Sequence, residues 1–438
     1  MTNSARVPSA EAFPSARRAN LTLALLLIAY IFSFLDRQIL SLMVAPIRAT
    51  LGINDFQVSL LQGLAFALFF VTAGLVLGRL ADRFRRTWII AAGIFLWSMM
   101  TIACGFASSF SMLFLARVGL GVGEAALAPA GFSLLADSFP PGRLVRATSI
   151  FSAGALLGGG LAFFVGGALI DYLGQMPPPL IIGNLQPWQI AFVVVAIPSL
   201  LLVPILLLIP EPARGGGTQA PVKLADLITY FWNRRADFAP FYLCTGLLSI
   251  LNYGGLSWFP THLIRTFDLS PGRTGVLLGA IQLVGSLIGA VGGAALTEYF
   301  QRRGRKDAHL RTVVVVALAA AVGFTAPFMP TLETTLIVWS FAIVTLGAYF
   351  GSIIAALQLM TPNNMRGANS ALVLMFSTLI GLAVGTSLIG GLADIAFAGR
   401  PSGIGYSLAC LGIPLALVTA VVAARGLPNF ARVVQELV

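Results

Sequence analysis

The chain has 438 residues, of which 58% are hydrophobic and 10% are charged. Globular chains usually contain about 45–50% apolar and about 25% charged residues, so this composition excludes a soluble protein of this length. The formal net charge of +11 is a feature of many nucleic-acid-binding proteins, but in membrane proteins Lys and Arg accumulate in cytoplasmic loops for topological reasons. We therefore expect an integral membrane protein that binds no nucleic acid.

Twelve apolar runs are long enough for membrane-spanning helices, which need about 20 residues each. Before them, residues 1–20 are polar and carry no cleavable apolar core, so a cytoplasmic tail is expected there. In the first half the predicted spans are 21–45, 57–78, 87–107, 111–136, 146–171 and 188–209. In the second half they are 237–262, 272–298, 310–328, 333–359, 367–394 and 403–425. Continuous runs of this length exclude a membrane β-barrel, whose strands are short and alternating.

A long polar loop over 210–236 divides the spans into two groups of six. The groups resemble each other, since an offset of 216 residues places Asp82 opposite Glu298, each followed by a basic cluster. The predicted fold class is an all-α integral membrane protein with 12 transmembrane helices in two pseudo-symmetric bundles. The N-terminal bundle covers 21–209 and the C-terminal bundle covers 237–425. Such repeats are typical of transporters whose substrate site lies between the halves.

The distribution of basic residues predicts the orientation in the membrane. Of the 27 Lys and Arg residues, 21 lie in loops and tails on the side of the N-terminus, 4 lie on the other side and 2 lie within spans. Both termini are therefore expected in the cytoplasm, including a C-terminal tail over 426–438.

Four charged residues lie well inside predicted spans: Asp36, Arg37, Arg117 and Glu124. Placing a charge at this depth in the bilayer costs free energy, so such residues usually face an internal cavity. At about 1.5 Å per residue, Asp36 lies about 14 Å and Glu124 about 18 Å from the outer ends of their spans, so the carboxylates share one level. We expect Asp36 and Glu124 to couple transport to protons, with Arg37 moving between partners.

Other roles for these four side chains stay open. Glu124 is either a second proton site or a contact for a cationic or hydroxyl part of the substrate. Arg37 and Arg117 pair the acids or bind an anionic headgroup, because a guanidinium fits phosphate and carboxylate well. The alternative is a set of structural salt bridges that fix helix packing. Salt bridges used for packing alone are unfavoured here, because removing the charges from water costs free energy.

The C-terminal half offers neutral groups in the equivalent places. The 216-residue offset places Asn252 opposite Asp36 and Tyr253 opposite Arg37. We expect substrate contacts from both halves, and ordinary helix packing is the alternative for each residue. The candidate substrate-binding residues are Glu124, Arg37, Arg117, Asn252, Tyr253, Trp258 and Gln282.

Several stretches resemble a known family. The loop 78–86 (Gly-Arg-Leu-Ala-Asp-Arg-Phe-Arg-Arg) resembles the signature loop of the major facilitator superfamily. The stretch 117–124 (Arg-Val-Gly-Leu-Gly-Val-Gly-Glu), with 34–37 (Phe-Leu-Asp-Arg) and 257–260 (Ser-Trp-Phe-Pro), resembles the spinster branch, whose animal members export sphingosine phosphate or lysophospholipids. One departure is 158–160 (Gly-Gly-Gly), which lacks the proline that many antiporters of the superfamily carry there.

The resemblance also implies a gate on the cytoplasmic side. Asp82 would hold it closed against the start of the eleventh span, where a helix N-terminus favours a carboxylate. Arg83 and Arg86 would pair with acids such as Asp137. The alternative for the arginines is a generic positive loop.

Together these features favour a proton-coupled secondary transporter that works by alternating access on an amphipathic, lysolipid-like substrate. The alternatives are a proton-coupled transporter of a small organic anion or drug, and a passive facilitator or channel. The sequence contains no P-loop, HExxH motif or Ser/His constellation, so ATP-driven pumping and enzymatic hydrolysis are not expected. We expect a monomer in a bacterial inner membrane, without cofactor or metal, driven by the proton gradient.

Overall fold

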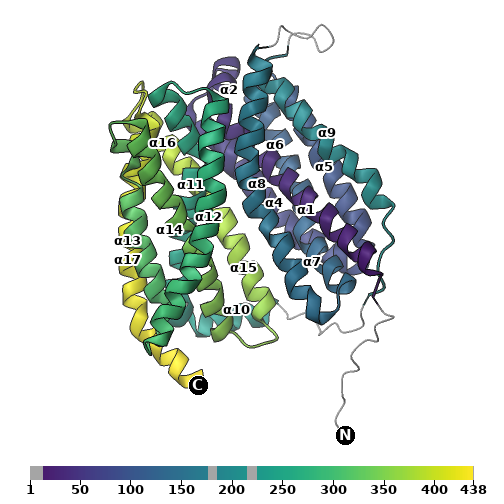
Figure 1. The fold of residues 1–438 in the computed structure, drawn as a ribbon, viewed down its shortest axis with the longest axis vertical. Helices are drawn as coiled ribbons and strands as arrows, with labels where there is room; N and C mark the ends of the chain where they lie inside the picture. Colours follow the sequence, from purple (N-terminus) through teal and green to yellow (C-terminus); the bar gives the residue numbers. More distant parts are fainter. Residues whose placement is uncertain (1–12, 176–184, 215–223, 438) are drawn as a thin grey trace.

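The computed structural model describes residues 13–175, 185–214 and 224–437, and every regular element within these ranges is helical (Figure 1). In the N-terminal half, the first span continues from α1 through a 3-10 turn, Ile39–Leu42. The second span contains a π-helical segment, Leu60–Leu64, between α3 and α4. The helices of this half are α1 (Ala16–Gln38), α2 (Val44–Leu51), α3 (Asp55–Ser59), α4 (Ala65–Arg83), α5 (Arg86–Gly105), α6 (Phe110–Glu124), α7 (Leu127–Ser138), α8 (Pro141–Gln175) and α9 (Pro187–Leu207).

The C-terminal half also contains a π-helical segment and a 3-10 turn, but not in the equivalent spans. A second π-helical segment, Leu379–Gly385, joins two helices of one span, and a 3-10 turn, Ala326–Phe328, ends another span. The helices are α10 (Leu224–Asn233), α11 (Arg235–Phe267), α12 (Pro271–Arg302), α13 (Ala308–Gly323), α14 (Leu332–Met360), α15 (Arg366–Thr378), α16 (Thr386–Ala396) and α17 (Gly403–Leu437).

The predicted fold class is confirmed. Eleven helical stretches of the described chain are long and apolar enough to cross a membrane. The remaining predicted span corresponds to α11, which has 33 residues. At 1.5 Å per residue it is about 50 Å long, more than the roughly 30 Å of a hydrocarbon core. Polar residues near its middle, such as Asn252, make it less apolar than the others.

Helix continues into segments that the sequence predicted as loop or tail. The predicted loop 210–236 contains α10 and the first residues of α11, and the predicted tail 426–438 is part of α17 as far as Leu437. Of the predicted tail 1–20, residues 16–20 belong to α1, whereas 1–12 lie outside the described residues. The reason is that hydropathy marks only the apolar part of a helix, and a polar end stays helical beyond it.

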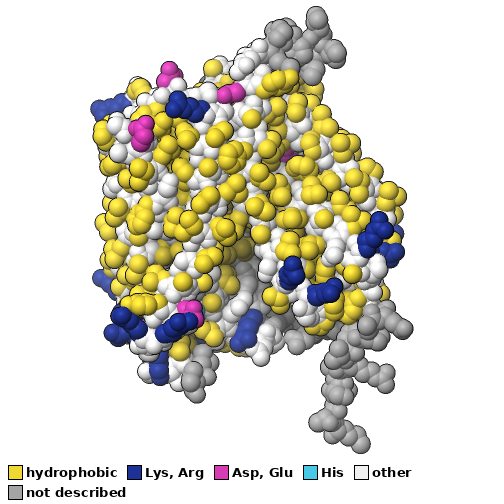
Figure 2. Space-filling model, viewed as in Figure 1, with side chains coloured by type: hydrophobic (Ala, Val, Ile, Leu, Met, Phe, Trp, Pro, Cys, Tyr) yellow, Lys and Arg dark blue, Asp and Glu magenta, His cyan; other side chains and the backbone are white. Residues whose placement is uncertain are grey.

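The two halves meet at one end of the molecule and diverge at the other (Figure 1). The end with the loops 79–86 and 302–311 is here called the basic end, because Lys and Arg side chains gather there (Figure 2). The surface is hollowed between the halves towards this end. Along α4, Phe66 is fully buried, whereas Val76, nearer the basic end, is 58% exposed. The opposite end is called the closed end.

At the closed end, α8 and α12 bring their backbones into contact across the two halves. A Cβ at Gly167 would lie 2.6 Å from the Pro271 carbonyl oxygen, and one at Gly275 would lie 2.1 Å from the Phe163 carbonyl oxygen. No side chain fits these gaps, so both glycines are required for this packing. Small residues allow the same close approach in other membrane helix pairs.

Candidate functional site

A buried ion pair connects α1 to α6 in the N-terminal half. Arg37 Nη2 donates to Glu124 Oε2 at 2.6 Å, and Ser33 Oγ donates to the same oxygen at 2.6 Å. The guanidinium of Arg37 lies 4.2 Å from the centroid of the Phe66 ring and 5.4 Å from that of Phe70. Two of the four intramembrane charges predicted from the sequence are therefore direct partners, and the predicted site did not include Ser33.

Asp36 precedes Arg37 in the chain but takes no part in this ion pair. Its side chain is fully buried, and neither carboxyl oxygen has a hydrogen-bond partner among the described residues. The carboxylate lies within electrostatic range of Glu124 and Arg117, so the two acids are neighbours as the depth estimate predicted. Glu124 is bound directly by a cation and a hydroxyl, whereas Asp36 has only looser interactions, with Arg117 and with the hydroxyl of Thr101, which itself donates to the Trp97 carbonyl oxygen at 2.9 Å.

Arg117 holds backbone groups rather than an acid. Its Nε donates to the Leu61 carbonyl oxygen at 3.1 Å and its Nη1 donates to the Asp36 carbonyl oxygen at 3.3 Å. Leu61 lies in the π-helical segment 60–64. The side chain is fully buried, so Arg117 links α6 to α1 and to the irregular part of the second span. Neither carbonyl contact was predicted from the sequence.

On the C-terminal half, a hydroxyl cluster lies near the half-buried Tyr253. Ser249 Oγ is 2.6 Å from Ser377 Oγ and 3.3 Å from the Tyr349 hydroxyl. Tyr253 lies within electrostatic range of Tyr349 and also of Tyr30 from α1, across the interface between the halves. The predicted pair Asn252 and Tyr253 therefore lies near the central interface. The three hydroxyl residues of the cluster were not predicted, because single Ser and Tyr residues carry no distinctive pattern.

Trp258 and Gln282, two other predicted substrate contacts, pack inside the structure. Trp258 is fully buried and its Nε1 donates to the Thr386 carbonyl oxygen at 3.0 Å. Gln282 Nε2 donates to Ser286 Oγ at 2.8 Å, and the side chain borders a cavity of about 10 Å³. That volume holds no ligand larger than water, so in this conformation both residues are packing groups.

The closed end is sealed by an ion pair between the halves. Asp55, at the start of α3, accepts hydrogen bonds from Arg265 Nη1 and Nη2 of α11, both at 2.7 Å. Arg48 of α2 adds a third contact at 3.1 Å. Asp55 is 5% exposed, so this is a bidentate and mostly buried pair, the strongest kind of charged hydrogen bonding.

Two further carboxylates seal the closed end at helix N-termini of the opposite half. Asp394 of α16 accepts from the backbone N–H of Phe56 at 2.7 Å and of Asp55 at 3.3 Å, in the first turn of α3. Asp171 of α8 accepts from the hydroxyl of Ser270, the N-cap of α12, at 2.7 Å. Both acids follow a Gly-Gly pair at the end of equivalent spans, a repeat visible in the sequence that could have identified them.

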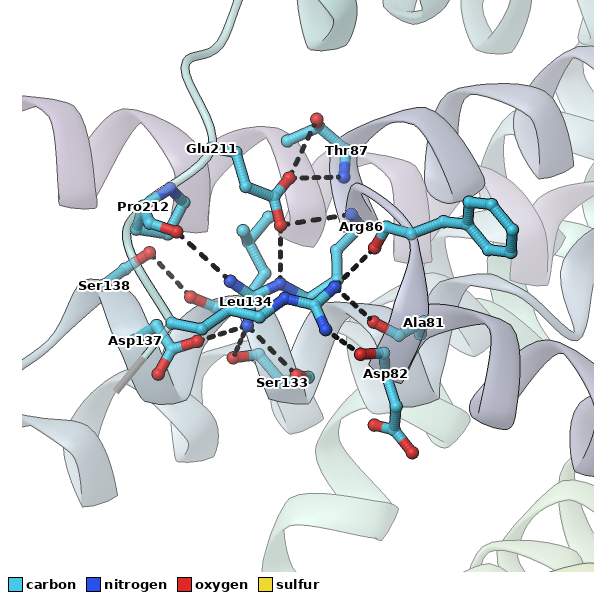
Figure 3. A network of polar contacts seen from close by, with 12 residues as sticks. Ala81, Asp82, Arg86, Thr87, Ser133, Leu134, Asp137, Ser138, Glu211 and Pro212 are labelled. Carbon is cyan, nitrogen blue, oxygen red and sulfur yellow. Dashed lines mark hydrogen bonds and ion pairs between the residues drawn. The ribbon is translucent and has the colours of Figure 1, made fainter. Parts of the chain in front are cut away.

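At the basic end, the loop at 79–86 is bound to the rest of its own half (Figure 3). The buried Arg86 forms an ion pair with Asp137 of α7 and donates from Nε to Glu211 Oε1 at 2.7 Å. Thr87 donates to Glu211 Oε2 from both its backbone N–H and its hydroxyl, each at 3.1 Å. Burial opposes ionisation of Glu211, but the hydrogen bonds from Arg86 and Thr87 outweigh it and hold the pKa of Glu211 below its ordinary value of 4.5.

The predicted contact of Asp82 with the eleventh span is not formed in this conformation. The Asp82 side chain points away from the network of Figure 3, and its backbone carbonyl accepts from Arg214. Near the start of α15, Asn369 instead accepts from the Tyr242 hydroxyl at 2.7 Å. The predicted pairing of Arg86 with Asp137 is present, whereas Arg83 is exposed on the surface.

No metal site is found within the described residues, since no three His, Cys, Asp or Glu side chains gather in a way that could hold an ion. The geometry is therefore that of two helical bundles with buried charges in one, hydroxyl groups in the other, a sealed end and an open end.

Comparisons with known proteins identify a family. The model of the Major Facilitator Superfamily matches residues 26–386. An MFS-type efflux pump from Mycolicibacterium smegmatis is 27% identical over 86% of this chain and 85% of its own length. Protein spinster from Drosophila melanogaster is 24% identical over 64% of this chain and 46% of its own length. A sphingosine-1-phosphate transporter from Danio rerio is 26% identical over 62% and 55%. The match thus spans about half the length of the latter two relatives.

Solved structures share the fold. A bacterial homologue of the human lysosomal transporter spinster, in an inward-facing and unoccupied conformation, aligns with a TM-score of 0.78, 24% identity and coverage of 96% of this chain and 98% of that chain. A D-xylose–proton symporter aligns with a TM-score of 0.67 and 16% identity over 91% and 96%. These findings confirm the resemblance inferred from the loop 78–86 and the stretch 117–124.

Proposed function

The chain belongs to the Major Facilitator Superfamily, and on that premise we propose that it is a proton-coupled secondary transporter that moves an amphipathic, lysolipid-like substrate by alternating access. One observation carries this proposal more than any other. The buried carboxylates Asp36 and Glu124 are neighbours, and the guanidinium of Arg37 is bound to Glu124, while that of Arg117 lies within electrostatic range of both acids. When two acids share nearby guanidiniums and only one acid is bound directly, gain or loss of a proton by the other can change these contacts.

Asp36 is the proposed proton carrier. An ionised carboxylate without a partner is expensive to bury, whereas a neutral carboxylic acid is tolerated. When Asp36 loses its proton, the new charge attracts Arg37, one residue away in the chain, and weakens its bond to Glu124. Ser33, which already bonds to Glu124 at 2.6 Å, keeps one partner on that acid during the exchange. Loading and release of the proton would thereby change the contact between α1 and α6.

The surroundings of Arg37 support an amphipathic substrate. Its guanidinium is flanked by the rings of Phe34, Phe66 and Phe70 at 4.2–5.4 Å. A guanidinium suits a phosphate or carboxylate head, and aromatic rings suit an apolar chain. The named activity of the Danio rerio relative, sphingosine-1-phosphate transport, agrees with this combination.

Export of a small organic anion or drug is the second candidate. It is favoured by the relative from Mycolicibacterium smegmatis, which is named an efflux pump and matches 86% of this chain. Such a substrate would need the guanidinium of Arg37 but not the aromatic rings around it. A substrate panel that contains both classes separates the two candidates.

The test is reconstitution of the purified chain in liposomes that enclose a pH-sensitive dye. Lysophospholipids and sphingosine phosphate are supplied beside small anions and drugs, and proton movement and substrate flux are recorded together. Asp36→Asn is expected to abolish coupled proton movement, and Glu124→Gln to impair it. Glu298→Gln is the matched control, because that carboxylate forms an exposed ion pair with Arg302. Undiminished coupling in both Asp36→Asn and Glu124→Gln would contradict the mechanism, and proton movement with small solutes alone would favour the second candidate.

The proposed setting is a bacterial inner membrane, with the basic end towards the cytoplasm and the chain acting as a monomer. The excess of Lys and Arg at that end supports the orientation. Labelling of single cysteines in intact cells tests it: Ala398→Cys at the closed end should react with an impermeant maleimide, and Arg83→Cys should react only after lysis.

A further inference from the structure

An apolar pocket lies at the basic end of the C-terminal half, where α10 packs beside α11 and α15. Its volume is about 430 Å³, within the range of about 300–1,000 Å³ that is typical of small-molecule sites. The walls come from three elements: Phe231 and Trp232 of α10, Tyr242 of α11, and Leu372 and Phe376 of α15. None of these residues belongs to the central site described above.

The walls are held in place by ring contacts that leave apolar faces towards the pocket. Phe231 and Tyr242 meet edge to face at 6.1 Å, and Tyr242 and Phe376 do so at 5.7 Å. The Tyr242 hydroxyl is satisfied by Asn369, to which it donates at 2.7 Å. The pocket therefore offers no free hydroxyl from Tyr242, and its chemistry suits a hydrocarbon chain.

One cation stands at the rim of this apolar pocket. Arg235 Nη1 donates to the Trp232 carbonyl oxygen at 3.1 Å, and its guanidinium lies 5.5 Å from the centroid of the Trp232 ring. No carboxylate pairs with Arg235 among the described residues, whereas its neighbour Arg234 is paired with Asp237 at 3.1 Å. Trp232 is 68% exposed, and exposed Trp residues favour the membrane–water interface.

We propose that this pocket binds an anionic phospholipid of the surrounding leaflet, with one acyl chain between the aromatic walls and the phosphate on Arg235. The charge of the rim selects the occupant, because a guanidinium without an acidic partner fits a phosphate. In a zwitterionic head group the same phosphate carries a tethered cation that opposes the guanidinium, so an anionic phospholipid is preferred. The bound lipid touches α15 through Leu372 and Phe376, and so holds the basic-end part of that helix against α11. This site does not depend on which substrate is transported.

The test is native mass spectrometry of the full-length protein in detergent with phosphatidylglycerol and phosphatidylcholine of identical chains. The intact chain is expected to bind the first phosphatidylglycerol about fivefold more tightly, since one Arg near an anionic lipid contributes on the order of 1 kcal/mol. Arg235→Gln should remove that preference. Ala239 of α11 also lines the pocket, so Ala239→Phe, which narrows the pocket but keeps the cation, should weaken binding of both lipids.

Arg303→Gln is the matched control, because Arg303 also lies over an aromatic ring at the basic end, 4.4 Å from the centroid of Tyr299. It should leave the preference unchanged, and Ala239→Leu replaces Ala239→Phe if the latter does not fold. An equal loss in Arg303→Gln would assign the preference to general surface charge and overturn the proposal. Complete displacement by glycerol 3-phosphate, which has no chain, would overturn it as well.

Discussion

Asp36 and Glu124 are chemically similar acids that the fold treats differently. Glu124 receives two hydrogen bonds at 2.6 Å, from Arg37 and Ser33, while the carboxyl of Asp36 receives none within the described chain. Both are almost completely buried. The difference arises from direction, because consecutive residues on a helix point about 100° apart, and it is Arg37 that reaches the Glu124 carboxylate.

The buried ion pair predicts a strong coupling between two substitutions. Arg37→Gln and Glu124→Gln are each expected to destabilise the protein by about 3–5 kcal/mol, because each leaves one buried charge unpaired. The double variant should recover most of that loss, as measured by thermal unfolding in detergent. The exposed pair Arg302 and Glu298 is the control, for which about 0–1 kcal/mol is expected. Additive losses in the Arg37 and Glu124 double variant would contradict this prediction.

Glu211 predicts a pH dependence of stability. Its pKa is held below the ordinary value of 4.5, so its stabilising effect is complete above that value and is lost as the pH falls through the lower, folded-state pKa. The melting temperature of Glu211→Gln should therefore lie below that of the unchanged protein at neutral pH. The two should converge in acid below pH 4.5. A constant difference across this range would exclude the ionised carboxylate as the cause.

At the scale of elements, the apolar runs in the sequence predict most span ends to within about five residues, because the bilayer requires a length that composition reveals; the exception is α17, which continues twelve residues beyond the predicted end at 425. The breaks inside them were not predicted. α6 ends at Glu124, and π-helical segments occupy 60–64 and 379–385. Apolar content is the same in an α-helix and a π-helix, so these breaks depend on partners such as Arg117, which donates to the Leu61 carbonyl oxygen.

Arg117 is expected to be essential for the local shape of the second span. Arg117→Leu would leave the carbonyl oxygens of Leu61 and Asp36 without their buried donor, at about 1–3 kcal/mol for each unsatisfied group. The expected result is a lower melting temperature. Arg79→Leu, which changes an exposed arginine of α4, should have little effect. An equal effect of both substitutions would show that the two carbonyl contacts contribute nothing.

At the scale of the whole molecule, the closed end combines contacts that lie far apart in the sequence. Asp55 and Arg265 are 210 residues apart, and Phe56 and Asp394 are 338 apart. The sequence pattern does not show which residues form such pairs, so the two predicted bundles were confirmed as a fold while the contacts that join them were missed, although the Gly-Gly repeat before Asp171 and Asp394 marks those two acids. The contact predicted for Asp82 belongs to the basic end, where the halves have separated.

Weakening the closed end should shift the molecule towards opening there. Asp394→Asn removes a carboxylate charge at the N-terminus of α3, an effect of about 0.3–1 kcal/mol, or roughly two- to fivefold in population. Spin labels on Ala49 and Ala398, both exposed at the closed end of opposite halves, would report a larger share of long distances. The control is Asp268→Asn, an exposed acid at the end of α11, for which no shift is expected.

The contact of Asp394 with α3 has a consequence for mutational tolerance. Its donors are backbone N–H groups of Asp55 and Phe56, and a backbone donor is present whatever side chain the position carries. Replacement of Phe56 by almost any residue therefore leaves the donor intact, while proline, which has no N–H, removes it. Selection can act on this contact through the single acceptor residue, Asp394, so this part of the seal depends on the side chain of only one half, unlike the Asp55–Arg265 pair.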